Sequence, residues 1–272
     1  MKYFKIHIKY DGSAYCGWQI QPNGISIQHV IETVLSRLAN QPVRIHGAGR
    51  TDAGVHALDQ VAHFQADTNL DATAFQKGLN GLLPSDIIAT SVRECSSEFH
   101  ARYSACGKYY LYIVQNGMLR SLILRNYSAY SQCFLDIQAM HNAAQSFVGT
   151  HNFKPFSANA GREHERYERT IHQVLIESHP PFIIFHVLGQ SFLYKMVRLM
   201  VGTLLDVGRG KIPPDTIANI LSTGDTLLVG TTAPAHGLFL KKVYYSEIQK
   251  ISPADKKCNF LPLFDVLNSG EI

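Results

Sequence analysis

The chain has 272 residues, 46% of them hydrophobic, and a formal net charge of +4. This length and composition suit one large domain or two fused smaller ones with a packed core, and they exclude an intrinsically disordered chain. The mildly basic balance permits an RNA partner without demanding one.

The start of the chain and its cysteines indicate where the protein works. The first residues alternate polar and apolar side chains, and no apolar run reaches membrane-spanning length. We therefore expect a cytoplasmic protein without a secretory signal or a membrane span. Five widely spaced cysteines without a CxxC pair argue against a disulfide framework and a zinc site. We expect free thiols at Cys16, Cys95, Cys106, Cys133 and Cys258.

Hydrophobic patterns in the first hundred residues predict six elements in the order β, α, β, β, α, β. Ser26 is placed to cap the first helix and Asp71 the second, and Pro84 ends the second helix. This order suits a ferredoxin-like unit, which is a sheet with helices on one face. Strands are expected at residues 3–10, 43–46, 57–65 and 87–93, and the first helix at 27–38.

The second half repeats this pattern loosely. Its most apolar segment, interrupted only by Lys195 and Arg198, predicts a long and largely buried helix. A hairpin is expected around Pro180-Pro181. The expected strands are 108–115, 170–177, 182–188 and 237–245, and the expected helices are 136–147, 191–207 and 214–221.

These patterns predict an α+β fold. Two ferredoxin-like (RRM-like) halves would form a mostly antiparallel sheet with helices on one face and an active-site cleft between the halves. We place the halves at residues 1–100 and 101–246. Residues 247–272 are expected to be a tail that either docks on the body or frays.

A polar, glycine-rich turn between two predicted strands carries the clearest signal for chemistry. Residues 45–57 hold three glycines, which let the backbone of another molecule approach closely. Within the turn Asp52 stands beside Arg50 and Thr51, and His56 follows. An isolated Asp in a loop is more often a turn former, but an acid with a cation and hydrogen-bonding groups around it suits catalysis better.

Phosphate loops and metal sites are the first rival interpretations of this turn. A dinucleotide fingerprint needs a third glycine three residues after Gly49, where Asp52 stands, and no GxxxxGK[ST] run occurs. His46, His56 and His63 form no HxH, HxxxH or HExxH pattern and have no second acid nearby. We predict no metal.

The run RTDAGVHA at residues 50–57 resembles the signature of TruA-type tRNA pseudouridine synthases. In that family the signature's Asp is the catalytic residue, which implies catalysis at Asp52. Five more segments resemble the family in its order, so the resemblance covers roughly residues 3 to 245. They are YDGSAYCGWQ at 10–19, FHARYSA at 99–105, KYYLY at 108–112, MVRLMVG at 196–202 and AHGL at 235–238.

The resemblance implies roles for five further residues. Tyr110 would be the active-site tyrosine, stacking on the extruded uracil, and Arg198 would pair with the catalytic acid and keep it ionised. Arg50 would fill the space of the flipped base or hold a phosphate. Lys108 and Arg102 would contact RNA. The alternatives are a strand aromatic, a buried charge paired elsewhere and solvated surface cations.

The resemblance also implies a substrate and an assembly. The partners would be tRNA, modified at uridines 38, 39 and 40 of the anticodon stem-loop, and a second copy in a homodimer. Isomerisation breaks a C–N bond and closes a C–C bond without redox change, so we expect no cofactor. The acid would attack the sugar or act as the base that forms a glycal, and the sequence favours neither route.

Two segments depart from the family. Tyr109 and Leu111 stand where basic residues are frequent, which weakens the expected phosphate contacts. In a loop at residues 151–156, Lys154 and Pro155 stand where small hydroxyl residues are usual.

Two other functions compete with this one. A noncatalytic RNA-binding protein would explain the basic and aromatic residues of the second half but not the carboxylate in the turn. A glycosidase would need a second acid, and the nearest, Asp59, is expected along a strand. The basic residues, which a merely solvated face explains equally well, are Arg102, Lys108, Arg162, Arg166, Arg169, Lys195, Arg198, Arg209 and Lys211.

Overall fold

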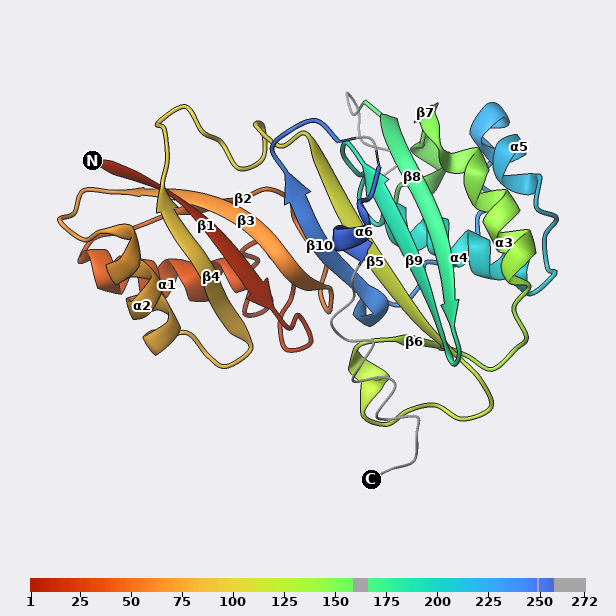
Figure 1. The fold of residues 1–272 in the computed structure, drawn as a ribbon, viewed down its shortest axis with the longest axis horizontal. Helices are drawn as coiled ribbons and strands as arrows, with labels where there is room; N and C mark the ends of the chain where they lie inside the picture. The colour runs from red at the N-terminus through yellow and green to blue at the C-terminus, as the bar shows by residue number, and fades with distance from the viewer. Residues whose placement is uncertain (159–165, 249, 257–272) are drawn as a thin grey trace.

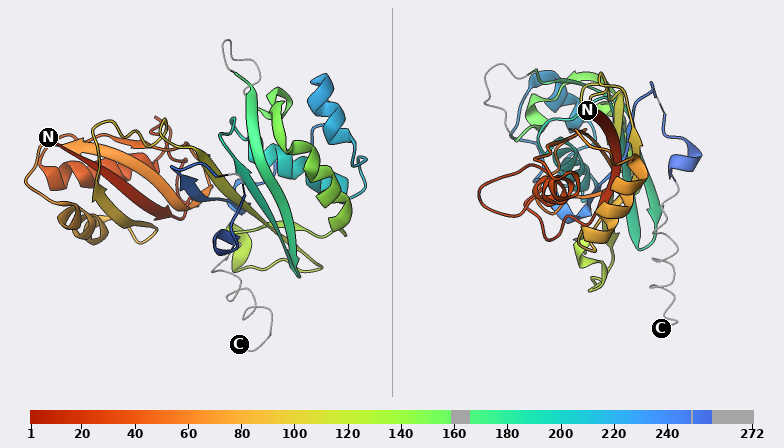
Figure 2. Two further views of the ribbon diagram at one scale, coloured as in Figure 1. Left: turned by 45° about the horizontal axis from the view of Figure 1, so that its top comes forward. Right: turned by 90° about the vertical axis from the view of Figure 1, so that its left-hand side faces the viewer.

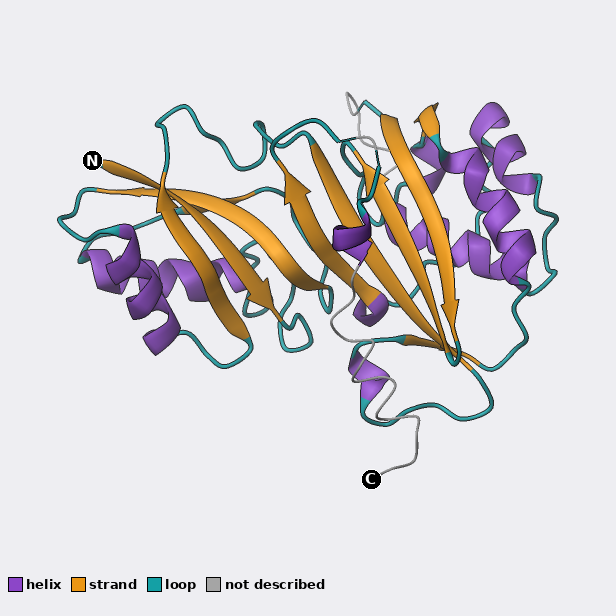
Figure 3. Ribbon diagram, viewed as in Figure 1, coloured by secondary structure: helices purple, strands orange, loops and turns teal. Residues whose placement is uncertain are grey.

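The fold is built on one sheet (Figure 1). The structure is a computed structural model, and it describes residues 1–158, 166–248 and 250–256. The described residues form ten strands in the order β4-β1-β3-β10-β5-β9-β8-β7, with β2 paired to β3 and β6 to β5. Figure 3 shows the longer helices grouped at the two ends of the sheet. No helix of the described residues is long and apolar enough to cross a membrane.

The first half is a ferredoxin-like unit with the strand order β4-β1-β3-β2, all pairs antiparallel, as the sequence predicts. The rings of Phe4, Phe64 and Phe75 lie 4.9–5.2 Å apart between the sheet and its helices. The elements are β1 (Lys2–Tyr10), α1 (Ile27–Ala39), β2 (Ile45–Gly47), β3 (His56–Ala66), α2 (Ala72–Leu82) and β4 (Ile87–Glu94).

The second half repeats the unit with the antiparallel order β10-β5-β9-β8. Its main elements are β5 (Gly107–Asn116), α3 (Ile137–Ala144), β8 (Glu168–His179), β9 (Phe182–Gly189), α4 (Met196–Gly208) and β10 (Leu238–Tyr244). Short elements that periodicity did not predict are η1 (Leu124–Asn126), β6 (Ala129–Ser131), η2 (Gln145–Phe147), β7 (Gly149–Asn152), η3 (Lys154–Phe156) and η4 (Ala235–Gly237), while α5 (Thr216–Thr223) was expected.

The two halves meet where β3 runs parallel to β10, with Phe239 opposite His56 and Leu240 opposite Ala57. Most other strand pairs are antiparallel, so the predicted mostly antiparallel sheet is confirmed. Because β3 begins directly after the glycine-rich turn, this junction brings the turn against the second half. Figure 2 shows the same continuity of the sheet from two further sides.

The largest error in a predicted boundary is at the start of α4. The helix expected from residue 191 begins at Met196, because Lys195 has a φ of +58°, which lies in the left-handed region and cannot continue a right-handed helix. Residues 190–195 instead form an irregular segment that leads from β9 into α4. The apolar pattern through Leu193 hid this break, since Leu193 is buried without being helical.

The described part of the tail docks on the face of the second half that α3 and α4 leave open. Ile251 packs there with Tyr109 and Leu111, so these two departures from the family point away from the helices. In α6 (Pro253–Lys256), Asp255 accepts hydrogen bonds from Lys242 Nζ at 2.6 Å and from Tyr244 Oη at 3.0 Å. The apolar stretch 260–264, Cys258 and Arg162 lie outside the described residues.

Candidate active site

The backbone of the turn between β2 and β3 is fixed by hydrogen bonds to residues of β3. Ala48 N donates to Val61 O at 2.7 Å, and Gln60 Nε2 donates to Gly49 O at 2.8 Å. A positive φ of +78° at Gly54 reverses the chain after Asp52. The carboxylate therefore projects from a closed turn whose two ends are held by β3.

A second loop, residues 11–19, packs against this turn. Trp18 N donates to Thr51 O at 3.1 Å, and the Thr51 hydroxyl lies 2.8 Å from Tyr10 Oη. Gly17 has a φ of +104°, and a side chain there would come within 2.6 Å of Thr51 O. Trp18 is buried against Gly47, so it is both a packed aromatic and a neighbour of the turn.

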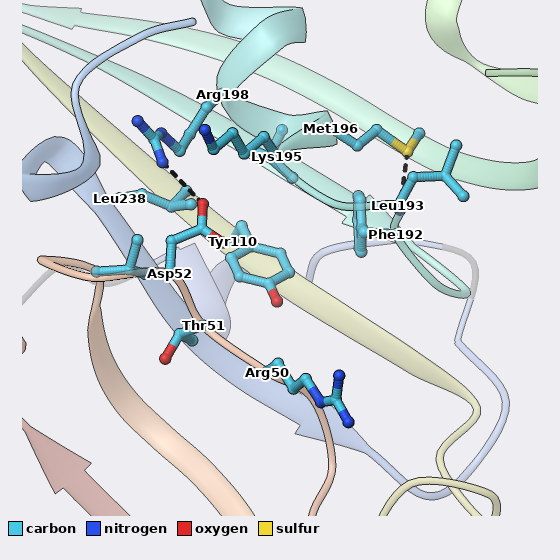
Figure 4. Close-up of a pocket in the computed structure, with 12 residues that line it drawn as sticks. Arg50, Thr51, Asp52, Tyr110, Phe192, Leu193, Lys195, Met196, Arg198 and Leu238 are labelled. Carbon is cyan, nitrogen blue, oxygen red and sulfur yellow. Dashed lines mark hydrogen bonds and ion pairs between the residues drawn. The ribbon is translucent and has the colours of Figure 1, made fainter. Parts of the chain in front are cut away.

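An ion pair between the two halves holds Asp52. Arg198 NH1 of α4 lies 2.7 Å from Asp52 Oδ2, and Arg198 Nε donates to Ala233 O at 2.8 Å (Figure 4). Both side chains are largely covered, with 13% and 19% exposure. Two fixed hydrogen bonds orient the guanidinium, so the carboxylate has one defined position in the pocket.

Tyr110 of β5 forms the floor of the same pocket, and its ring stands edge-on to Phe192 with centroids 5.1 Å apart (Figure 4). The side chain is 7% exposed. Burial, with the nearby Tyr10 and Asp52, raises the pKa of the Tyr110 hydroxyl, which therefore stays protonated at neutral pH. The described residues offer this hydroxyl no hydrogen-bond acceptor, which leaves it available to a ligand.

Of three further cations named by the sequence, one lines this pocket, the second lies against the turn, and the third lies near the second. Arg50 is exposed and lines the pocket, without an ion pair to any described residue. The Lys108 side chain lies against the turn, with Nζ 3.3 Å from the place where a side chain at Gly49 would begin. Burial, with Arg102 and Arg169 nearby, lowers the pKa of Lys108 to about 8. Arg102 is exposed in the segment before β5.

Sequence reasoning missed the pocket wall between β9 and α4. Phe192, Leu193 and Lys195 line the pocket from the irregular segment that was expected to be helical. The positive φ of Lys195 turns this segment into α4, and a lysine gives no sequence signal for that conformation.

The rival assignments of nearby residues find other partners. Asp59 lies 2.7 Å from His7 Nδ1 and does not line the pocket. His56 accepts a hydrogen bond from Gly12 N at 3.1 Å, and its Nε2 lies 2.9 Å from Asn126 O. Among residues 1–158, 166–248 and 250–256, no three His, Cys, Asp or Glu side chains are grouped as metal ligands would be.

Comparisons with known proteins point to one family. A family model described as tRNA pseudouridine synthase matches residues 6–104 and 143–246. A protein named tRNA pseudouridine synthase A from Exiguobacterium sibiricum is 42% identical over 250 residues, which cover 92% of this chain and 99% of that protein. Proteins of the same name from Acetivibrio thermocellus and Geobacter sulfurreducens are 41% and 42% identical over 245 residues. These two matches cover 90% of this chain and all of each relative.

A solved structure titled as the archaeal box H/ACA sRNP Nop10-Cbf5 complex covers 87% of this chain and 47% of its own. Its identity is 11% and its TM-score 0.36, too low to support an argument. The family model and the full-length relatives decide the assignment: both matched segments contribute to the pocket that holds Asp52, Tyr110 and Arg198. The chain belongs to the tRNA pseudouridine synthase family.

Proposed function

We propose that the chain isomerises uridine to pseudouridine in tRNA and that Asp52 is its catalytic residue. The observation that carries this proposal is the pocket itself. Asp52 is the one carboxylate among the described residues that line it, and Arg198 orients that carboxylate toward the space in front of Tyr110. A noncatalytic RNA-binding protein has no use for an acid fixed in this way, because a negative charge repels RNA phosphates.

Each pocket residue has a proposed role in the reaction. The glycosidic C–N bond breaks, the base turns, and a C–C bond to C5 closes. Asp52 either attacks the sugar or removes a proton to give a glycal, and Arg198 holds the charged carboxylate in place. The Tyr110 ring stacks on the freed uracil, with its hydroxyl near the proton that leaves C5. Arg50 occupies the space that the flipped base leaves, or binds a phosphate.

The finer assignments are the target sites, the assembly and the domains. By family resemblance we propose uridines 38, 39 and 40 of the anticodon stem-loop, a cytoplasmic homodimer, and RNA contacts from Lys108 and Arg102. Residues 1–100 would supply the catalytic turn, and residues 101–246 the active-site tyrosine and the RNA-binding segments. Light scattering should give about twice 30.3 kDa. A monomer that still modifies tRNA would remove the dimer from this scheme.

The decisive test replaces Asp52 with Asn. The swap is almost isosteric in a turn that tolerates Asn, so we expect a folded protein that binds tRNA but forms no pseudouridine. Tritium release from 5-tritiated uridine measures turnover, and filter binding measures affinity on the same preparation. Asp59→Asn is the matched control, since Asp59 lies outside the pocket, and it should stay active. Near wild-type turnover in a folded Asp52→Asn variant would end the proposed mechanism.

A further inference from the structure

An exposed aromatic ring lies outside the pocket lining, in the segment between β4 and β5. The Tyr103 side chain is 78% exposed. Its ring lies 4.2 Å from the ring of His100, centroid to centroid, and the Arg102 guanidinium lies 5.9 Å from it. We call the rings of His100 and Tyr103 the Tyr103 shelf. Core packing does not account for so exposed a ring.

Backbone hydrogen bonds fix the ring beneath Tyr103. His100 Nδ1 accepts from Arg102 N at 3.1 Å and from Tyr103 N at 3.3 Å. Next to it, His63 Nδ1 accepts from Ala101 N at 3.1 Å. The His63 and His100 rings are 4.6 Å apart. An aromatic series therefore runs from β3 outward to Tyr103, and the shelf is ordered before anything binds to it.

The two imidazoles work as neutral rings in this arrangement. Burial, with His100 and His46 nearby, lowers the pKa of His63 to about 4. Burial and His46 also lower the pKa of His100. Neutral imidazoles keep the Nδ1 lone pairs that accept the backbone amides, so the shelf is intact at neutral pH.

The surroundings of the shelf favour RNA. Arg102 makes no ion pair with a described residue, and its charge is close enough to lower the pKa of Lys108. Lys108 in turn touches the turn at Gly49, which carries Asp52 three residues later. Arg102 and Lys108 thus form a series of neighbouring cations between the shelf and the turn that carries Asp52. Any unpaired base can stack on an aromatic face while its phosphate meets a cation.

We propose that the Tyr103 shelf stacks an unpaired base of the RNA substrate while Arg102 binds an adjacent phosphate. The proposal rests on the proposed function for the identity of that RNA as tRNA. The shelf lies outside the pocket lining, so it anchors the RNA and takes no part in the bond changes.

Three substitutions test this role. Tyr103→Ala removes the ring, and the Kd for a tRNA transcript should rise about tenfold to hundredfold. Tyr103→Phe keeps the ring and should bind like the wild type. At saturating tRNA, the single-turnover rate of both variants should equal that of the wild type, because the pocket is unchanged. Unchanged affinity in folded Tyr103→Ala protein would overturn the proposal.

A fluorescence measurement reports stacking directly. The natural chain has one tryptophan, Trp18, which is 2% exposed, so Tyr103→Trp adds a solvent-exposed indole to a buried background. Saturating tRNA should quench the added emission, and emission that tRNA leaves unchanged counts against stacking. If Tyr103→Ala alters the mass by light scattering but not the RNA affinity, the shelf is a protein contact and the proposal fails.

This test is separate from that of the proposed function. Filter binding and quenching need no turnover, so they can be repeated in an Asp52→Asn background. A wild-type protein that forms no pseudouridine but shows ring-dependent RNA binding would leave the shelf standing and remove the proposed reaction.

Discussion

The Asp52 carboxylate shares its pocket with two groups of opposite properties: a guanidinium that pairs with it, and a tyrosine hydroxyl that has no hydrogen-bond acceptor among the described residues. Asp52 and Arg198 are 146 residues apart in the sequence. Hydrophobic periodicity could place Tyr110 on a strand and Arg198 on a helix. It could not bring them together, because no local pattern encodes contact between two halves of a chain. Family resemblance predicted that Arg198 pairs with Asp52, and the structure has this ion pair.

Replacing Tyr110 with Phe should separate stacking from proton handling. The ring remains, so tRNA affinity should change little, whereas turnover should fall about a hundredfold if the hydroxyl serves the proton at C5. The matched control is Tyr112→Phe on the same strand. Its hydroxyl donates to Pro234 O at 2.8 Å and does not line the pocket, so its loss should lower stability by about 1 kcal/mol and spare turnover. A fully active Tyr110→Phe variant would leave stacking as its only role.

Lys108 should make RNA binding depend on pH. Its pKa of about 8 in the folded protein means that the ammonium loses its proton as pH rises through 8, and the tRNA Kd should rise with it. In the unfolded chain the group stays charged up to about 10.5. Stability should therefore increase with pH between these two values, where the unfolded chain binds more protons.

Lys108→Arg is the control for this pH dependence, because a guanidinium stays charged throughout the range. Filter binding at a series of pH values measures the effect. The wild type should lose affinity as pH rises through about 8, and the Arg variant should keep it. Parallel curves for the two proteins would show that another group titrates.

At the scale of elements, start signals that lie within a few residues were predictable from sequence. Ser26, Asp71 and Asp136 each accept a hydrogen bond from the backbone N–H three residues later, as helix caps do. The start of α4 was not predictable, because the strain at Lys195 is sustained by tertiary packing around the pocket. The short strand β2 was expected to begin two residues too early. Its bounds are set by its pairing with β3, which is also a tertiary contact and leaves no local signal.

The loop beneath the catalytic turn offers a prediction at this scale. Gly17→Ala places a methyl group 2.6 Å from Thr51 O at a φ of +104°, so the turn must shift and the left-handed backbone adds about 1–2 kcal/mol of strain. The displaced turn carries Asp52, so turnover should fall even at temperatures where the variant is fully folded. Gly81→Ala in α2 is the control, because nothing lies within 4 Å of its new methyl group. It should stabilise the protein by about 1 kcal/mol without changing turnover. Thermal melts and tritium release measure both effects.

For the whole molecule, the junction of β3 with β10 explains why the pocket needs both halves. Only two residue pairs form the parallel ladder between them, yet the turn before β3 and the segment before α4 face each other across it. The order of elements was predictable, because each half carries the strand and helix order of a ferredoxin-like unit. The junction was not, because each half satisfies its own pattern without the other.

Four cations in the pocket, at the turn and before β5 should make tRNA binding steeply dependent on salt. Arg50, Arg102, Lys108 and Lys195 have no ion pair with a described residue, so each is free to displace a counterion from an RNA phosphate. A plot of log Kd against log salt should have a slope that falls by about 1 when a single phosphate-binding cation is removed. Arg102→Ala and Lys108→Ala should each show this fall.

Lys211→Ala is the control for the salt prediction. Its ammonium lies 3.3 Å from Asp206, beyond the end of α4 opposite the pocket, so its loss should leave the slope unchanged. A slope that falls equally in all three variants would mean that net charge alone attracts the RNA. A slope that responds only to Arg102 and Lys108 would place the phosphates along the path from the Tyr103 shelf to Asp52. The same data would then favour a substrate backbone that crosses the junction between the halves, because that path begins before β5 and ends at the turn before β3.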